Sequence, residues 1–367
     1  MRILMVCARY LPLTGGTEQH VHEVGRRMAA RGHHVTVLTT DRDGGLPARE
    51  QREGMHIIRC AAGPSGSDLY WSPDIWREIV RADHDLVHVQ GWHTLVAPLA
   101  MAAAIRRRKP FALTFHSGGH SSPSRQAVRG LQARLLRPLA ARARQLIGVS
   151  RFEADHFSRA LNIARERFQV IGNGAQMPQP ATRSDTSSDG TRLILSVGRL
   201  ERYKGHHRVL EALPLVLARQ PRTRLRIAGD GPYEAALHAL VQRLDLGAVV
   251  EIGRIPPSQR DAMANAMASA SLVTLISDYE AHPVAVMEAV SLGTPVLTTD
   301  TSGFIELAER GLVRTVPLRA SREELAEAIL AGMDAPVRSP LTLPLSDWDD
   351  CTSQLLRSYR DMLGAEA

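Results

Sequence analysis

The first 40 residues contain the pattern that most constrains the fold. An apolar segment at residues 1–8 predicts a strand, and an amphipathic segment from Glu18 to Ala30 predicts a helix. Gly32 ends that helix, and residues 34–40 form a second apolar segment. This strand–loop–helix–strand order is typical of a parallel sheet. Such sheets bind ligands in the loops that follow the carboxyl ends of their strands.

The same alternation continues along the chain. Further strands are predicted at 54–60, 86–90, 111–115, 145–149, 168–171, 193–197, 224–228, 249–252, 272–276 and 295–299. Residues 178–190 are rich in Pro, Ser, Thr and Asp, which is the composition of a linker. A chain of 367 residues is also too long for one ordinary core. We therefore expect two α/β domains, 1–174 and 191–345, joined by a linker at 175–190.

Composition excludes several classes of protein. No apolar run approaches the roughly 18 residues of a membrane span, and the N-terminal run is too short for a signal peptide. The three cysteines, Cys7, Cys60 and Cys351, have neither CxxC nor metal-binding spacing. A reduced, cytoplasmic setting fits this pattern.

Charge is unevenly distributed between the two halves. Residues 1–172 carry 25 Lys and Arg against 14 Asp and Glu, whereas the remainder carries 20 against 24. A basic half could face a membrane or an anionic acceptor, or could simply be an arginine-rich surface. No nucleic-acid motif is present and few aromatic side chains could stack on bases, so we expect no nucleic-acid partner.

Several polar residues of the first half follow predicted strands directly. His116 and Ser117 follow the strand at 111–115, and Trp92 and His93 follow the strand at 86–90. Such positions face the ligand crevice of a parallel sheet, although a lone histidine is more often a satisfied core residue. After the first strand, Gly15 and Gly16 could let backbone amides approach a phosphate, or form a plain turn.

Three other polar motifs of the first half have structural interpretations. Asp83-His84-Asp85 precedes its strand and is interpreted as a surface turn rather than a metal site. Residues 124–144 form a basic amphipathic helix, broken at Pro138, that is either a solvated face or a membrane contact. Ser150 and Glu153 have the spacing of a helix capping box.

The second half carries charged residues at the same kind of position. Arg199 and Lys204 lie in the loop after the strand at 193–197, where two cations would suit a diphosphate. Glu280 precedes a helix that starts near Pro283, and Glu288 lies inside it. Their backbones are then roughly 12 Å apart, which suits the two ends of a longer ligand with a diphosphate on the helix N-terminus. Two solvent-facing helix glutamates would give the same spacing.

Taken together, these motifs resemble a known enzyme family. Glu280-x7-Glu288 followed by Gly293-Thr-Pro-Val296, and Gly198-Arg-Leu-x3-Lys-Gly205, are similar to motifs of the retaining glycosyltransferases of family 4 (GT4). Gly15-Gly16, His116, Gly229-Asp-Gly-Pro232 and Gly253-Arg-Ile255 occur in the family's order. The resemblance implies the GT-B fold, in which two Rossmann-like α/β domains face a cleft and a last helix, here 346–367, returns to the first domain.

The resemblance also implies an activity. A sugar would pass from a nucleotide-diphosphate sugar, expected to be a UDP-sugar, to a hydroxyl acceptor with retention of configuration and with no metal or other cofactor. The acceptor could be a small metabolite, a glycan or a lipid-linked sugar, and peripheral membrane contact is possible. Two alternatives are a nucleotide-sugar 2-epimerase of the same fold and a non-catalytic nucleotide- or membrane-binding protein.

Family roles map onto individual residues of this chain. The catalytic set would be His116, Glu280, Arg199 and Lys204, with Glu288 on the ribose. Further donor contacts would come from Gly15, Gly16, Ile255, His282, Val284, Ala285 and Val286, and acceptor contacts from Trp92, His93 and Ser117. One departure concerns Ala281-His282-Pro283, where many relatives have Gly-Phe-Gly. Pro283 cannot donate an N–H, so the phosphate-binding amides must lie further along.

Overall fold

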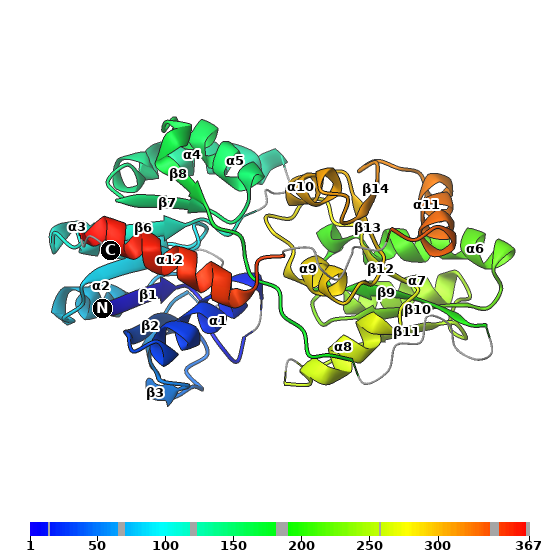
Figure 1. Cartoon of the computed structure of the whole chain (residues 1–367), viewed down its shortest axis with the longest axis horizontal. Helices are drawn as coiled ribbons and strands as arrows, with labels where there is room; N and C mark the ends of the chain where they lie inside the picture. The colour runs from blue at the N-terminus through cyan, green and yellow to red at the C-terminus, as the bar shows by residue number, and fades with distance from the viewer. Residues whose placement is uncertain are drawn as a thin grey trace. The chain divides into compact units, whose positions relative to one another are not determined.

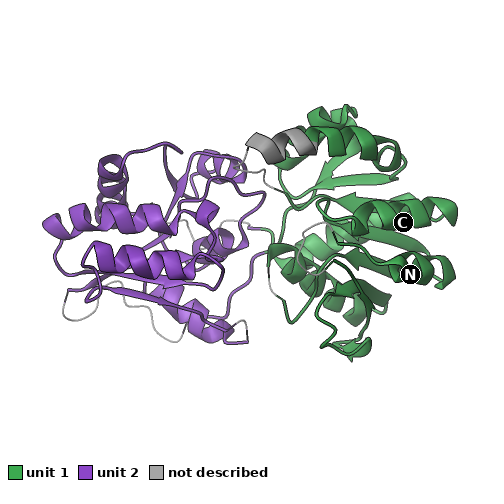
Figure 2. Cartoon of the chain, turned by 180° about the vertical axis from the view of Figure 1, so that it is seen from behind, with its two compact units in different colours: residues 1–118, 122–174, 346–367 green, residues 119–121, 175–345 purple. Residues whose placement is uncertain are grey.

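The computed structural model describes residues 1–13, 15–64, 70–117, 123–180, 190–256, 258–337 and 345–364, without the side chains of 123–129. The chain divides into two compact units, coloured green and purple in Figure 2. The first comprises residues 1–118, 122–174 and 346–367, and the second is built on residues 175–345.

The first unit is organised around an eight-stranded sheet of order β3-β4-β2-β1-β5-β6-β7-β8 (Figure 1). Its strands are β1 Arg2–Cys7, β2 His34–Asp41, β3 Arg49–Arg52, β4 Met55–Ala61, β5 Leu86–Gln90, β6 Phe111–Thr114, β7 Gln145–Gly148 and β8 Phe168–Val170. Neighbouring strands are parallel, except that β3 pairs antiparallel with β4. The strand order reverses between β1 and β5, so the loops after these strands diverge and leave a crevice at the carboxyl edge.

Helices connect these strands. They are α1 Gly16–Ala30, α2 Pro73–Arg81, α3 Val96–Arg106, α4 Pro123–Ala140, α5 Arg151–Leu161, the 3₁₀ turn η1 Arg165–Arg167 and the last helix α12 Trp348–Leu363. Helix α12 packs beside α1 (Figure 1) and begins with a capping box between Asp347 and Asp350. The expected break at Pro138 is absent, because α4 continues through this residue to Ala140.

The second unit has a six-stranded, fully parallel sheet of order β11-β10-β9-β12-β13-β14. Its strands are β9 Arg192–Val197, β10 Thr223–Ala228, β11 Val250–Gly253, β12 Leu272–Leu275, β13 Val296–Thr299 and β14 Arg314–Val316. Its helices are η2 Arg202–Lys204, α6 His206–Arg219, α7 Glu234–Arg243, α8 Arg260–Ala268, α9 Val284–Ser291, α10 Gly303–Glu309 and α11 Arg322–Asp334. Numbered within the unit, this order is 3-2-1-4-5-6, the Rossmann arrangement, with its reversal between β9 and β12.

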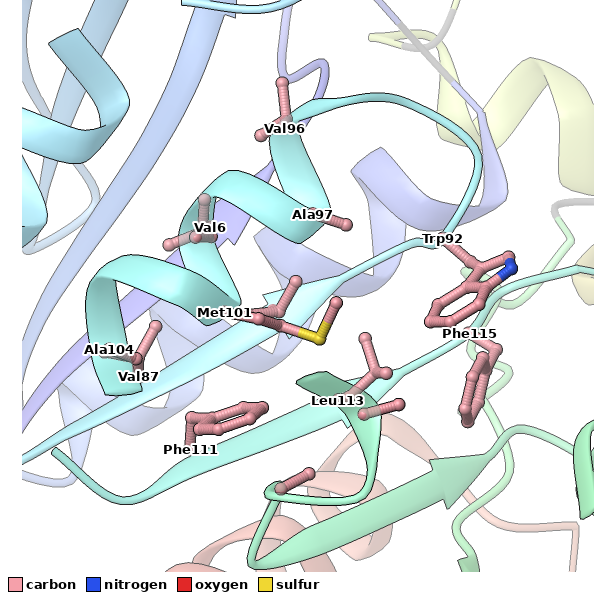
Figure 3. Close-up of a cluster of buried hydrophobic side chains, with 14 of the residues drawn as sticks. Val6, Val87, Trp92, Val96, Ala97, Met101, Ala104, Phe111, Leu113 and Phe115 are labelled. Atoms are coloured by element: carbon pink, nitrogen blue, oxygen red, sulfur yellow. The ribbon is translucent and has the colours of Figure 1, made fainter. Parts of the chain in front are cut away.

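Each unit has its own apolar core. In the first, side chains of β5, β6 and α3 interlock in the cluster of Figure 3, where Phe111, Leu113 and Phe115 follow one another along one face of β6 and its end. In the second, Ala175 and Met177 from the stretch expected to be a linker join the core. Residues 181–189 of that stretch lie outside the described part. None of the described helices is long and apolar enough to cross a membrane.

Candidate functional site

Two loops of the second unit meet where its strand order reverses. One follows β9 and carries Arg199 and Lys204; the other follows β12 and carries Glu280. Lys204 Nζ donates to Glu280 Oε1 at 2.5 Å, and each side chain is only 14% exposed. The structure thus brings together a cation and a carboxylate that lie 76 positions apart.

The position of Glu280 is fixed by its neighbours. Ser277 Oγ donates to the same carboxylate oxygen at 3.0 Å, and Glu280 N–H donates to Ser302 Oγ at 2.8 Å. Ser302 has φ 46° and ψ −129°, a conformation that costs a non-glycine residue free energy and persists only where the surroundings enforce it. Sequence reasoning did not assign a role to the loop from Asp300 to Gly303, so the support that this loop gives Glu280 was missed.

The N-terminus of α9 offers fewer amides than expected. Pro283 is the cap residue and cannot donate, and the N–H of Val286 donates to the Pro283 carbonyl at 3.1 Å. Among the described residues, the N–H groups of Val284 and Ala285 form no hydrogen bond. Two amides and the positive end of the helix dipole therefore remain for an anion.

Glu288 is buried, so the alternative interpretation of two solvent-facing glutamates is wrong for this residue. It is 4% exposed and accepts a hydrogen bond from Arg260 at 2.6 Å. The same guanidinium nitrogen donates to the Gln176 carbonyl at 2.9 Å. Sequence reasoning missed Arg260, because it opens α8 and is 28 positions from its partner.

The remaining donor-side candidates lie in loops that follow strands of the second unit. Arg199 pairs with Glu201 at 2.5 Å and is 42% exposed, so its guanidinium is accessible. Its carbonyl accepts from His206 Nε2 at 3.2 Å, and burial lowers the pKa of His206 to about 4. Ile255 is half-buried against the core, and His282 is half-buried beside Pro283.

In the first unit, His116 stands at the carboxyl end of β6. Its φ of 52° is left-handed, an uncommon conformation for a non-glycine residue that is enriched at functional sites. Its Nε2 bonds Gln90 Oε1 at 2.7 Å, and its ring packs edge-on against His20, with 4.7 Å between centroids. His20 in turn bonds Asn173 at 2.9 Å. Burial is the largest cause of the low pKa of His116, followed by the charges of His20 and His88.

The loop that carries His116 is anchored by Glu153. This carboxylate accepts hydrogen bonds from the N–H groups of Ser117 and Val149, so it does not return to Ser150 and complete the expected capping box. Ser150 still caps α5 by accepting from Glu153 N–H at 3.2 Å. Complete burial raises the pKa of Glu153 to about 7, against the lowering effect of its backbone donors.

The structure corrects the acceptor assignment of Trp92. Its indole is 2% exposed and packs against Phe115 and Phe157, with centroid distances of 5.4 and 5.8 Å (Figure 3 shows Trp92 and Phe115). It therefore offers no surface to an acceptor. Ser117 is also buried, whereas His93 is half-buried beside Trp92.

Other candidates of the first unit lie as follows. Gly15 caps α1, and a Cβ there would come 2.5 Å from the Glu18 carboxylate, which would have to shift; a Cβ on Gly16 would meet nothing within 4 Å. Asp83 and Asp85 pair with Arg2 in a surface turn. Within the described residues, no three His, Cys, Asp or Glu side chains are placed to hold a metal ion.

Comparison with solved structures defines the class of protein. The fold matches sucrose-phosphate synthase from Thermosynechococcus elongatus with a TM-score of 0.78 and 21% identity, covering all of both chains. It matches Anabaena HepE in complex with UDP and glucose with a TM-score of 0.79 and 22% identity, over 98% of this chain and 100% of the other. The chain therefore has the two-domain α/β fold of GT-B glycosyltransferases.

Sequence comparison identifies the family within that class. The family model described as Glycosyltransferase Family 4 matches residues 14–177, and that described as Glycosyl transferases group 1 matches residues 179–337. Glycogen synthase of Mycobacterium tuberculosis is 32% identical over 381 residues, covering 94% of this chain and 87% of the relative. GDP-mannose:cellobiosyl-diphosphopolyprenol alpha-mannosyltransferase of Xanthomonas oryzae is 27% identical, with coverages of 99% and 98%. The chain belongs to glycosyltransferase family 4 and is an enzyme that transfers a sugar.

Proposed function

We propose that this transferase takes its sugar from a nucleotide-diphosphate sugar that binds mainly to the second unit. The observation that supports the proposal is the Lys204–Glu280 pair, because it brings a cation and a carboxylate to the point where the sheet order reverses, and a carboxylate can accept hydrogen bonds from sugar hydroxyls. The free amides at the start of α9 lie on the same loop as Glu280 and suit a diphosphate.

The chemistry assigns a role to each group. Negative charge grows on the diphosphate as the glycosidic bond breaks, and Arg199 and Lys204 would stabilise it. Glu280 would accept hydrogen bonds from sugar hydroxyls, and the buried Glu288 from those of the ribose. Arg199 would then exchange its partner Glu201 for a phosphate oxygen, which an exposed guanidinium can do at low cost.

His116 would contact the reacting sugar from the first unit, with Gly15 and Gly16 near the phosphates. We expect transfer with retention of configuration, without a metal or other cofactor. Both expectations rest on membership of family 4.

Two bases are candidates for the nucleotide of the donor. We favour a UDP-sugar, and a GDP-sugar is the second candidate because a relative covering nearly the whole chain is named for GDP-mannose. The half-buried Ile255, after β11, is the residue proposed to lie near the base.

Thermal shift with UDP, GDP, ADP, TDP and their glucose and mannose derivatives separates these choices. A ligand at 100 times its dissociation constant adds about 2.7 kcal/mol of stability. We expect one nucleotide to stand out and Arg199→Ala to weaken its binding by about tenfold to 100-fold. Arg202→Ala, a loss of one charge in the same loop, is the control. Equal binding by Arg199→Ala and wild type would contradict the phosphate assignment, and interconversion of a UDP-sugar without acceptor would favour an epimerase.

We also propose that the first unit contacts an anionic membrane through α4. Leu131 and Leu135 are 59% and 67% exposed, and Arg134 and Arg137 are exposed on the same stretch. Apolar and basic side chains together suit the interface of an anionic bilayer. A lipid-linked acceptor would then be presented at this surface, although a small metabolite or a glycan would need no such contact.

A further inference from the structure

A chain of hydrogen bonds runs from His116 into the core of the first unit. His116 Nε2 bonds Gln90 Oε1 at 2.7 Å, and Gln90 Nε2 lies 3.1 Å from His88 Nδ1. That nitrogen is 2.5 Å from the hydroxyl of Tyr359 on α12, while His88 Nε2 bonds Thr114 Oγ1 at 2.8 Å. Gln90, His88, Thr114 and Tyr359 are at most 3% exposed.

Such a network is costly in a core of parallel strands. Polar groups lose hydrogen bonds to water on burial, and only well-formed hydrogen bonds within the protein compensate for that loss. Apolar side chains would fill the same space without this cost in free energy. The network could merely tie α12 to the sheet. Its outer end, however, is the residue with left-handed backbone at the carboxyl end of β6, and this points to a role at the site.

The donors and acceptors determine where the protons lie. An amide nitrogen only donates, so His88 Nδ1 must accept, and its proton then lies on Nε2, which donates to Thr114. The amide oxygen of Gln90 only accepts, so His116 must carry its proton on Nε2. The lone pair of His116 therefore lies on Nδ1.

Reversing the Gln90 amide would invert every assignment. The amide nitrogen would then donate to His116 Nε2, which would move that proton to Nδ1, and the amide oxygen would require a proton on His88 Nδ1. The tautomers of the two histidines are thus coupled through one side chain. The hydroxyls of Tyr359 and Thr114 can donate or accept, so they accommodate either arrangement, and the first is the one in which Gln90 Oε1 faces His116.

We propose that Gln90 is a positioning residue that holds His116 as its Nε2–H tautomer, backed by His88 and Tyr359, so that Nδ1 accepts a hydrogen bond from a substrate hydroxyl. The tautomer rests on the orientation of the Gln90 amide, with its oxygen towards His116, whereas the substrate contact rests on the proposed function. The low pKa of His116 keeps the ring neutral, as an acceptor must be.

Nitrogen-15 NMR on the full chain tests the tautomer without any substrate. Long-range proton–nitrogen spectra distinguish the two neutral tautomers, and His116→Gln and His88→Gln assign the signals by their loss. We expect Nε2–H for both histidines in the wild type and a mixture at His116 in Gln90→Met. A proton on Nδ1 of His116, or a tautomer unchanged in Gln90→Met, would overturn the proposal.

Kinetics test the positioning role. Hydrolysis of UDP-glucose or of GDP-mannose, in which water takes the sugar and UDP or GDP is released, should show kcat about tenfold to 100-fold lower in Gln90→Met, with KM for the donor nearly unchanged. Gln90→Glu should recover part of kcat, because a carboxylate accepts the same hydrogen bond. Gln145→Met is the matched control, since it removes a glutamine that bonds Gln169 at 2.9 Å in the same sheet, outside the network.

These experiments distinguish the proposed role of His116 from the proposed role of Gln90. If His116→Ala transfers sugar normally while the NMR result holds, the proposed function of His116 fails and the substrate contact fails with it. If His116→Ala is inactive but Gln90→Met keeps a wild-type kcat, the positioning role of Gln90 is wrong and the proposed function stands.

Discussion

His116 and Ser302 hold backbone conformations that most side chains avoid, with φ values of 52° and 46°. Each residue follows a parallel strand, and the side chain of each forms a hydrogen bond with a residue of a neighbouring loop or strand. Ser302 Oγ accepts from Glu280 N–H, and the next residue, Gly303, donates its own N–H to the Glu280 carbonyl at 2.8 Å. The donor-side carboxylate is therefore held through its backbone as well as its side chain.

Gly303 provides a prediction at this scale. A Cβ at this residue would lie 2.2 Å from the Ala281 carbonyl oxygen and 3.0 Å from that of Glu280, so Gly303→Ala must displace the loop. We expect a loss of about 1–3 kcal/mol of stability and weaker nucleotide-sugar binding. Chemical denaturation and thermal shift measure the two effects. Gly247→Ala, where a Cβ meets nothing within 4 Å, is the control, and equal behaviour of the two variants would contradict the role of Gly303.

At the scale of elements, helices of the first unit differ in which side chains they expose. Helix α12 buries Trp348, Leu355 and Tyr359 against the sheet and α1, and Tyr359 reaches the network of His88. Helix α4 instead presents Leu131 and Leu135 to solvent. Both helices bury one face, and they differ in that α4 carries leucines on its exposed face.

The exposed face of α4 leads to a prediction about membranes. Wild-type protein should float with vesicles containing anionic phosphatidylglycerol and much less with neutral phosphatidylcholine vesicles, because apolar burial and charge attraction act together. Leu131→Gln combined with Leu135→Gln should abolish flotation without changing donor binding. Leu215→Gln, at an exposed leucine of α6, is the control. Retained flotation of the double variant would rule out α4 as the contact.

At the scale of the whole molecule, both units bury neutral histidines. Burial lowers the pKa of His20 to about 4 and of His88 to about 3 in the first unit, and of His206 to about 4 in the second. Below pH 6.5 the unfolded chain binds protons that these folded sites refuse, so stability falls as pH falls from 6.5 through 4. Glu153 acts in the opposite direction, because its pKa of about 7 makes the folded state bind the extra proton between pH 4.5 and 7.

We therefore expect net acid destabilisation between pH 6.5 and 4, because the effect of His20, His88 and His206 together exceeds that of Glu153. For His20 alone the difference in pKa corresponds to about 3 kcal/mol. Urea denaturation of each variant at pH 7 and at pH 4.5 measures it. His20→Gln should reduce the difference between the two pH values, whereas His238→Gln, at an exposed histidine, should not. An unchanged difference in His20→Gln would contradict the assignment.

Much of the architecture was predictable because it depends on local patterns. Buried parallel strands are short apolar runs, and turns between them need glycine, so the strands and the strand-end positions of Arg199, Glu280 and His116 follow from residue order. The family motifs likewise keep fixed spacing within short continuous segments, which is why the sequence alone identified the glycosyltransferase family.

Only the tertiary structure decided which of those residues meet. Lys204 pairs with Glu280, which is 76 positions away, and Arg260 pairs with Glu288, which is 28 positions away. The chain of hydrogen bonds from His116 to Tyr359 spans 243 positions. The tertiary structure also determines that Trp92 packs in the core and that Glu153 accepts a hydrogen bond from Ser117 N–H. Strand order and burial determine these contacts. The periodicity of one segment predicts neither, because both depend on which distant segments pack against that segment.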